Sequence, residues 1–114
     1  MKKPSRYVPL PNEIFSLGLT PGEISVYTYL LFCASRKSNQ CWPSYRKIGG
    51  AVSMSINTVH KYICFLVDKG LISTENTSVI TGAGIKRNGN LRYTIRPIRE
   101  VMEEFHQRQL RKLA

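Results

Sequence analysis

Apolar residues recur every three or four positions in three successive segments of the chain, and this spacing predicts helices. The first segment runs from about 21 to 36. The second is short and begins after Ser44, and the third spans 55 to 69. A turn of only three or four residues separates the two helices predicted from the second and third segments. Two helices joined in this way form a helix-turn-helix, which we predict at about 44–69.

The predicted helix 21–36 has a well-defined start. Thr20 is a suitable cap, Pro21 stands at the first helical position and Glu23 at the third, which together form a capping-box pattern. Apolar residues cover most of the circumference of this helix instead of one stripe. We therefore expect the helix to be central in the fold or to face a partner.

Two adjacent glycines, Gly49 and Gly50, stand inside the predicted short helix. Each costs about 1 kcal/mol relative to alanine at such a position. We interpret them as places where a neighbouring backbone comes close.

After Gly70 the period of the pattern changes from 3.6 to 2, which predicts strands. Residues 71–77 and 91–96 form the two arms of a hairpin whose tip lies within 78–90. The turn itself stays open, because the pair Asn88 and Gly89 could form a two-residue connection. From about residue 98, apolar residues return at helical spacing and predict a last helix.

The charge of the chain is unusual for its length of 114 residues. Lys and Arg total 17 against 7 Asp and Glu, a formal net charge of +10. The window 36–99 holds eleven basic and two acidic residues, so it alone carries +9. A domain of this size has one core, and a domain this basic usually works near a polyanion.

Other features exclude some classes of protein. The longest apolar stretch, 26–34, is too short for the roughly 20 residues of a membrane span, and no apolar segment typical of a secretory signal follows the first residues. The three cysteines are odd in number and show no CxxC spacing, which favours a reducing, cytoplasmic setting over a disulfide framework.

The order helix, short helix, turn, helix and basic hairpin resembles a winged helix-turn-helix domain, most closely in residues 43–59 and 68–72. Residues 7–15 and 41–44 resemble, more narrowly, a small bacterial group that occurs in regulators and in replication proteins of phages, plasmids and conjugative elements. Ser53 departs from the pattern, since glycine often occupies this place in the turn. A positive φ there would strain serine.

The resemblance implies an α+β fold with a three-helix core, a β-hairpin wing at 71–97 and an extra C-terminal helix. We expect an extended basic arm at 1–11, with Lys2, Lys3 and Arg6, then the winged helix-turn-helix domain at 12–97 and an amphipathic helix at 98–114.

Candidate DNA contacts come from the second helix of the motif, from the start of the helix before it and from the wing. In such motifs the N-terminal part of the second helix enters the major groove, and wings contact the backbone or a minor groove. Polar groups there suit base edges, an isoleucine suits a thymine methyl, and basic side chains suit phosphates. The candidates are Ser44, Tyr45, Arg46, Lys47, Ser55, Ile56, Asn57, Thr58, His60, Lys61, Lys86, Arg87 and Arg92.

Simpler roles stay open for several of these residues. Asn57 and Thr58 stand in a first helical turn and could only help to cap it. Arg46 or Lys47 could be a solvated charge. Arg92 could protect an edge of the hairpin.

Catalytic and metal chemistry is poorly represented. His60 and Cys64 are four residues apart on one predicted helical face. With Cys41 as a third ligand they could form a metal site. A metal there would either compete with DNA for the same face or act as a sensor. We predict no metal and no cofactor. Phosphate-binding glycine motifs and paired catalytic acids are also missing from the sequence. We predict a protein that is not an enzyme.

The sequence therefore predicts a sequence-specific binder of double-stranded DNA that acts as a transcriptional regulator. One alternative is the origin-binding module of a plasmid or mobile-element replication initiator. Another, of a different class, is a winged-helix protein-interaction module, which the apolar first helix favours. A homodimer through the first and last helices is a further hypothesis. It rests on their apolar side chains, namely Tyr29, Leu30, Cys33, Met102, Phe105 and Leu113.

Overall fold

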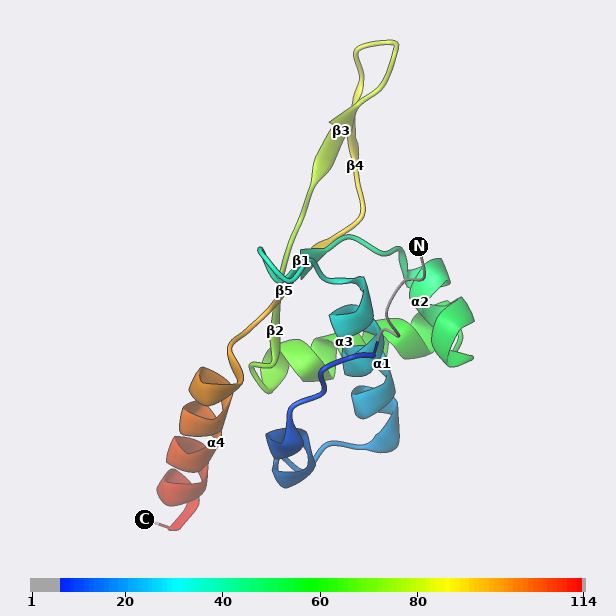
Figure 1. Ribbon diagram of the computed structural model, residues 1–114. Coiled ribbons are helices and arrows are strands. Elements are labelled where there is room, and N and C mark those ends of the chain that lie inside the picture. The colour runs from blue at the N-terminus through cyan, green and yellow to red at the C-terminus, as the bar shows by residue number, and fades with distance from the viewer. Residues whose placement is uncertain (1–6, 114) are drawn as a thin grey trace, which may run out of the picture.

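A computed structural model describes residues 7–113 (Figure 1). It has an α+β fold, as predicted, with a short 3-10 helix, four α-helices and antiparallel strands. The helices are η1 (Asn12–Ser16), α1 (Pro21–Cys33), α2 (Tyr45–Val52), α3 (Ile56–Asp68) and α4 (Ile98–Leu113). The strands are β1 (Gln40–Cys41), β2 (Ile72–Glu75), β3 (Ser78–Ile80), β4 (Lys86–Asn88) and β5 (Arg92–Ile95). The basic residues of the expected arm, 2, 3 and 6, lie outside the described residues.

Helix α1 begins as predicted but ends earlier. The Thr20 hydroxyl accepts a hydrogen bond from the Glu23 amide, and the Glu23 carboxylate accepts one from the Thr20 amide, so the capping box is complete. The helix ends at Cys33 instead of about 36, because Ala34 adopts an extended backbone. The chain then turns, and Asn39 takes a positive φ of 57° on the way to β1.

The predicted helix-turn-helix is present with the predicted caps. Ser44 accepts a hydrogen bond from the Lys47 amide at the start of α2, and Ser55 accepts one from the Thr58 amide at the start of α3. Ser53 closes α2 in the left-handed region, with φ 58° and ψ 48°. The turn therefore does require a positive φ, and this chain meets the requirement with serine.

The sheet contains one strand that the sequence did not predict. Its order is β1-β5-β2, and β1 pairs antiparallel with β5 through Cys41 and Tyr93. The segment 37–43 that contains β1 is polar and shows no alternating pattern. A two-residue strand leaves too few alternating positions to produce a recognisable pattern.

The hairpin after α3 has a second pair of strands within 78–90, where the sequence predicted only the tip. Strands β3 and β4 form a separate two-stranded sheet that continues the β2–β5 hairpin away from the helices (Figure 1). The turn lies at 81–85, where the Thr81 amide donates to the Ile85 carbonyl and the Gly84 amide donates to the Thr81 carbonyl. Gly89 is not in this turn, because it lies between β4 and β5 with its amide bonded to the Thr77 carbonyl.

The core joins all three helices of the motif to the sheet. Its largest buried side chains, all under 2 % exposed, include Ile14, Tyr27, Leu30, Ile48, Leu66, Leu71, Ile72 and Tyr93. Two apolar residues lie outside this core, since Val67 on α3 is 40 % exposed, although its spacing places it with the buried face, and Leu113 on α4 is 84 % exposed. Each lies at the C-terminal end of its helix, where the neighbouring elements no longer cover that face.

Helix α4 is attached to the domain by one buried residue, Val101, by partly buried neighbours and by polar contacts. Arg96 donates hydrogen bonds to the Gly70 carbonyl and to the Glu104 carboxylate. Arg108 donates to the last carbonyl of α3, that of Asp68, and to the Lys69 carbonyl. A cation at this point stabilises the helix because it satisfies carbonyls that have no partner within α3.

Candidate nucleic-acid interface

Helix α3 presents one face to the core and a different one to solvent. Val59, Ile63 and Leu66 are buried. Ile56, Asn57, His60, Lys61 and Cys64 are exposed, as predicted. Because residues 56 and 60, and 57 and 61, are four apart, the exposed set forms a continuous strip over the N-terminal half of α3.

The first turn of α3 divides its polar side chains between capping and solvent. The Ser55 hydroxyl accepts from the Thr58 amide and donates to the Thr58 hydroxyl at 2.9 Å, so both side chains are engaged with each other. Asn57 makes no side-chain hydrogen bond within residues 7–113 and is exposed. Of the two residues for which capping was an open alternative, Thr58 takes part in the cap and Asn57 remains available to a ligand.

His60 of α3 lies between two side chains, Tyr45 of α2 and Cys64 one turn further along α3. Its ring centroid is 5.7 Å from that of Tyr45, and its Nε2 atom is 3.6 Å from the Cys64 sulfur. Burial, and then the neighbouring Cys64 thiol, raise the pKa of Tyr45, which stays a neutral hydroxyl near pH 7. Tyr45 is therefore half-buried support for the histidine as well as a candidate contact.

Basic side chains flank this strip on both helices. Lys61 is exposed, with its Nζ atom 5.0 Å from the centre of the Tyr62 ring. Arg46 and Lys47 are exposed at the start of α2, where Ser44 is occupied as the cap. Within residues 7–113 none of these three cations is in an ion pair, so all three can meet phosphates.

An open groove beside the start of α2 contains Trp42, which is not among the candidate contacts predicted from the sequence. Trp42 is half exposed, and its carbonyl accepts a hydrogen bond from the Asn90 side chain at 3.1 Å. Lys47 and Phe32 line the same groove. The available signal in the sequence was a tryptophan two residues before the Ser44 cap.

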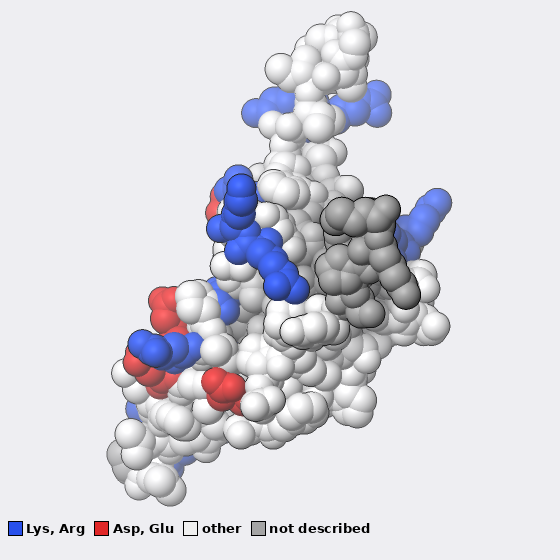
Figure 2. Space-filling model, in the orientation of Figure 1, with Lys and Arg blue, Asp and Glu red and all other residues white. Residues whose placement is uncertain are grey.

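The two basic residues of the wing point in opposite directions. Lys86 pairs with Ile80 and Arg87 with Val79 across the β3–β4 ladder, and successive residues of a strand face opposite sides. Figure 2 shows the resulting blue groups on either side of the hairpin, with no red group beside them. Most red atoms in this view gather lower down, around α4.

Arg92 differs from the other candidates because its charge is already compensated. It is half-buried and forms an ion pair with Glu75, the residue directly opposite on β2. Arg96 is likewise occupied, by Glu104 at 2.7 Å. The hydrogen bond from Arg96 also lowers the pKa of the Glu104 carboxyl, against a smaller effect of burial.

The C-terminal end of α3 is held by a buried carboxylate. Glu23 is 1 % exposed, and its Oε2 atom lies 2.8 Å from the Lys69 Nζ. Burial acts to raise the pKa of Glu23, but hydrogen bonds from Lys69 and Thr20 outweigh it, so this pKa lies below its usual value. The capping-box residue of α1 thus also fixes the residue that follows α3.

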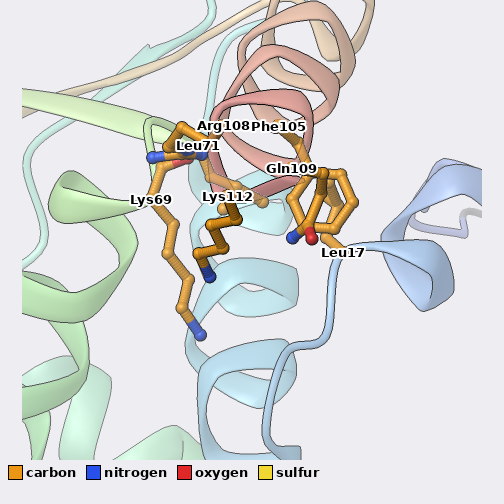
Figure 3. A pocket seen from close by; sticks show the side chains of 7 residues that line it. All are labelled: Leu17, Lys69, Leu71, Phe105, Arg108, Gln109 and Lys112. Carbon is orange, nitrogen blue, oxygen red and sulfur yellow. The ribbon is translucent and has the colours of Figure 1, made fainter. Parts of the chain in front are cut away.

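A cavity of about 210 Å³ lies beside this ion pair, between the end of α3 and α4. Figure 3 shows Phe105 and Gln109 of α4 beside Leu17, with the Lys69 and Lys112 side chains extending on the other side. Lys69 and the strip around Asn57 lie at opposite ends of α3. This cavity is therefore separate from the candidate interface.

Cys41 does not join His60 and Cys64 in a cluster. Cys41 is buried in the core, where its thiol donates to the Leu30 carbonyl at 3.6 Å. Burial, with a further contribution from Cys33, raises the pKa of Cys41 to about 12. Residues 7–113 contain no group of three or more His, Cys, Asp or Glu placed to hold a metal ion.

The three helices of the motif match a known protein family. A family model described as a helix-turn-helix domain matches residues 17–72, which contain α1, α2 and α3. This segment belongs to the helix-turn-helix domain family. Nearly all of the wing and the whole of α4 lie beyond the matched residues, and together with the motif they give the winged helix-turn-helix fold expected from the sequence.

A solved structure supports the same fold over more of the chain. It is that of a "possible transcriptional regulator" from Methanosarcina mazei Go1, which is similar with a TM-score of 0.58 and 18 % sequence identity over 87 % of this chain and 77 % of that one. None of the curated protein sequences matches this chain. Within residues 7–113, no helix has both the length and the apolar character needed to cross a membrane.

Proposed function

We propose that this helix-turn-helix protein binds double-stranded DNA sequence-specifically and acts as a transcriptional regulator. The observation that carries the proposal is the exposed N-terminal strip of α3, which is polar at Asn57 and His60 and stands in a segment of net charge +9. The family of residues 17–72 and the similarity to a possible transcriptional regulator support it.

The candidate residues divide into three roles in this proposal. Asn57 and His60 hydrogen-bond base edges in the major groove, and Ile56 contacts a thymine methyl. Lys61, Arg46 and Lys47 bind phosphates on either side of the groove. Lys86 and Arg87 bring the wing to the backbone or to a minor groove. Ser44, Tyr45, Ser55 and Thr58 contribute mainly by fixing these helices, and Arg92 contributes least because Glu75 neutralises it.

The test is selection from a random-sequence duplex pool at several salt concentrations. Five or six phosphate contacts give a slope of about −5 in log K against log salt, at roughly 0.9 per contact. Asn57→Ala should weaken the preference for the enriched sequence and leave the slope of log K against log salt unchanged. Lys86→Ala should lower affinity for all sequences alike and reduce the slope by about 0.9.

Each result has a definite meaning. A steep slope with an enriched sequence supports specific binding, and a steep slope without enrichment supports binding to DNA of any sequence. Absence of binding at low salt overturns the proposal and favours the protein-interaction module, with the apolar face of α1 as the surface to examine.

A homodimer through α1 and α4 is part of the proposal. Leu30 is buried in the core, and Tyr29, Cys33, Met102 and Phe105 are partly buried against it. The side chains left for a partner are Phe32 of α1 and Leu110 and Leu113 of α4, all well exposed. A dimer mass in light scattering and an enriched palindrome support this pairing, and a monomer mass at tens of micromolar rejects it.

A further inference from the structure

The end of the wing exposes aliphatic side chains that nothing in the domain covers. Val79, Ile80 and Ile85 are 53 %, 78 % and 54 % exposed, and they are absent from the core cluster. The hairpin extends away from the helices (Figure 1), so the domain itself does not shelter them. An exposed hairpin of β-branched residues invites association unless a partner occupies it.

The aliphatic side chains lie on both faces of the hairpin, and this indicates the shape of the surface that would cover them. Ile80 shares one face of the ladder with Lys86, and Val79 shares the other face with Arg87. Ile85, next to Lys86 on the returning arm, lies on the face of Val79 and Arg87. Each face therefore carries aliphatic surface and one cation. A flat partner would cover only one face, whereas a groove covers both.

The charge of the wing identifies the chemistry of the groove. Residues 76–91 contain no acidic residue and carry the two cations just named. A groove that accommodates these two cations should have anionic walls. Both grooves of double-helical DNA are bordered by phosphates. The turn at 81–85 contains Gly82, Ala83 and Gly84, which make a slender tip able to enter a groove first.

We propose that the wing enters the minor groove beside the site of α3 and opens it, with Ile80 and Ile85 acting as apolar wedges that bend the DNA. Two strands about 4.8 Å apart, with side chains on both faces, are wider than a minor groove of about 6 Å. Entry therefore requires a widened groove. Apolar side chains placed at base steps achieve this in other minor-groove proteins and kink the duplex by roughly 20–90° towards the major groove. The inference rests on the proposed function.

The test measures bending and binding separately on the duplex that the selection enriches. A donor and an acceptor dye at its two ends report the bend by energy transfer. The double variant Ile80→Thr, Ile85→Thr keeps β-branched residues but removes most of the aliphatic surface. Val67→Thr near the C-terminal end of α3 is the control, since it makes the same kind of change at an exposed aliphatic residue outside the wing and outside the proposed DNA and dimer contacts.

The wild type and the Val67→Thr variant should bend the duplex. The double threonine variant should bind about tenfold more weakly, because it loses aliphatic surface that the groove covers, and should not bend the duplex at saturation. Its salt slope should be unchanged. The Lys86→Gln, Arg87→Gln variant should show the opposite pattern, with a slope reduced by about 1.8 and the bend retained at saturation.

Three results overturn the inference. One is an unbent complex with the wild type, and another is a full bend with the double threonine variant. The third is a DNA-free dimer that the double threonine substitution dissociates in light scattering, because the aliphatic residues then cover a second copy. Absence of any DNA binding is distinguishable from these, since it rejects the proposed function itself.

Discussion

Gly49 and Gly50 offer a direct test of how the helix-turn-helix is packed, because they are adjacent in α2 and differ in surroundings. A Cβ atom added at Gly49 would lie 2.5 Å from the carbonyl oxygen of Met54. At Gly50 an added Cβ would have no atom within 4 Å. We therefore predict that alanine destabilises the protein at the first position and stabilises it at the second.

The two effects can be given magnitudes. Alanine gains up to about 1 kcal/mol over glycine in a helix interior, and at Gly50 nothing opposes this gain. At Gly49 the contact is about 1 Å shorter than ordinary carbon contacts, and the Met54 amide is bonded to the Gly49 carbonyl at 2.9 Å, which restrains the turn from moving. Overpacking of this kind costs about 1–3 kcal/mol. Because the helix term is common to both variants, their difference of about 1–3 kcal/mol isolates the steric cost.

Urea unfolding followed by far-UV circular dichroism measures both free energies of unfolding. Gly50→Ala should raise the midpoint and Gly49→Ala should lower it, with equal m-values. Specific DNA affinity should fall with Gly49→Ala, since the turn that orients α3 has moved. Equal stability of the two variants would show that the Met54 carbonyl does not press on α2, and the packing argument would fail.

Three further substitutions test the anchors of α3. Glu23→Gln should lower the free energy of unfolding by about 1–2 kcal/mol at pH 7, since it removes a hydrogen-bonded charge pair. The folded-state pKa of Glu23 is depressed from 4.5, so its contribution is present above about pH 4.5 and is lost as the pH falls through the folded value. A loss of the same size at pH 3 in urea titrations would contradict this reasoning. Ser53→Gly relieves a positive φ at the cost of a more flexible unfolded chain, and the melting temperature should rise by a few degrees. Arg108→Ala should lower the melting temperature by about 4 °C, because two carbonyls lose a donor, while Arg111→Ala, an exposed control, should leave it unchanged.

The helices were predictable because their signals are local. Ser44 and Ser55 each precede an amphipathic run, and in both cases the side chain caps the helix as expected. The strip around Asn57 follows from helical geometry once the buried face is known. Local chemistry of this kind needs no knowledge of the tertiary fold.

The sequence-based predictions were incomplete where contacts between residues far apart in the chain determine the structure. Strand β1 exists because Cys41 meets Tyr93, a residue more than fifty positions away. Gly50 has the same sequence environment as Gly49, and only the path of the turn separates their roles. The pairing of Arg92 with Glu75 depends on the strand register, which the unresolved choice of turn left undetermined.

The two elements proposed to contact DNA differ in how they are supported, and this difference bears on function. Helix α3 is fixed at its start by the Ser55 cap and the turn against Gly49, and at its end by the Glu23 ion pair and by Arg108. Its exposed strip is therefore ordered before any ligand arrives, which reduces the entropy lost on binding. The outer wing has only its own ladder and exposes its aliphatic residues. Sequence preference should accordingly come from α3, while the contribution of the wing depends on how readily a given DNA sequence opens to receive it.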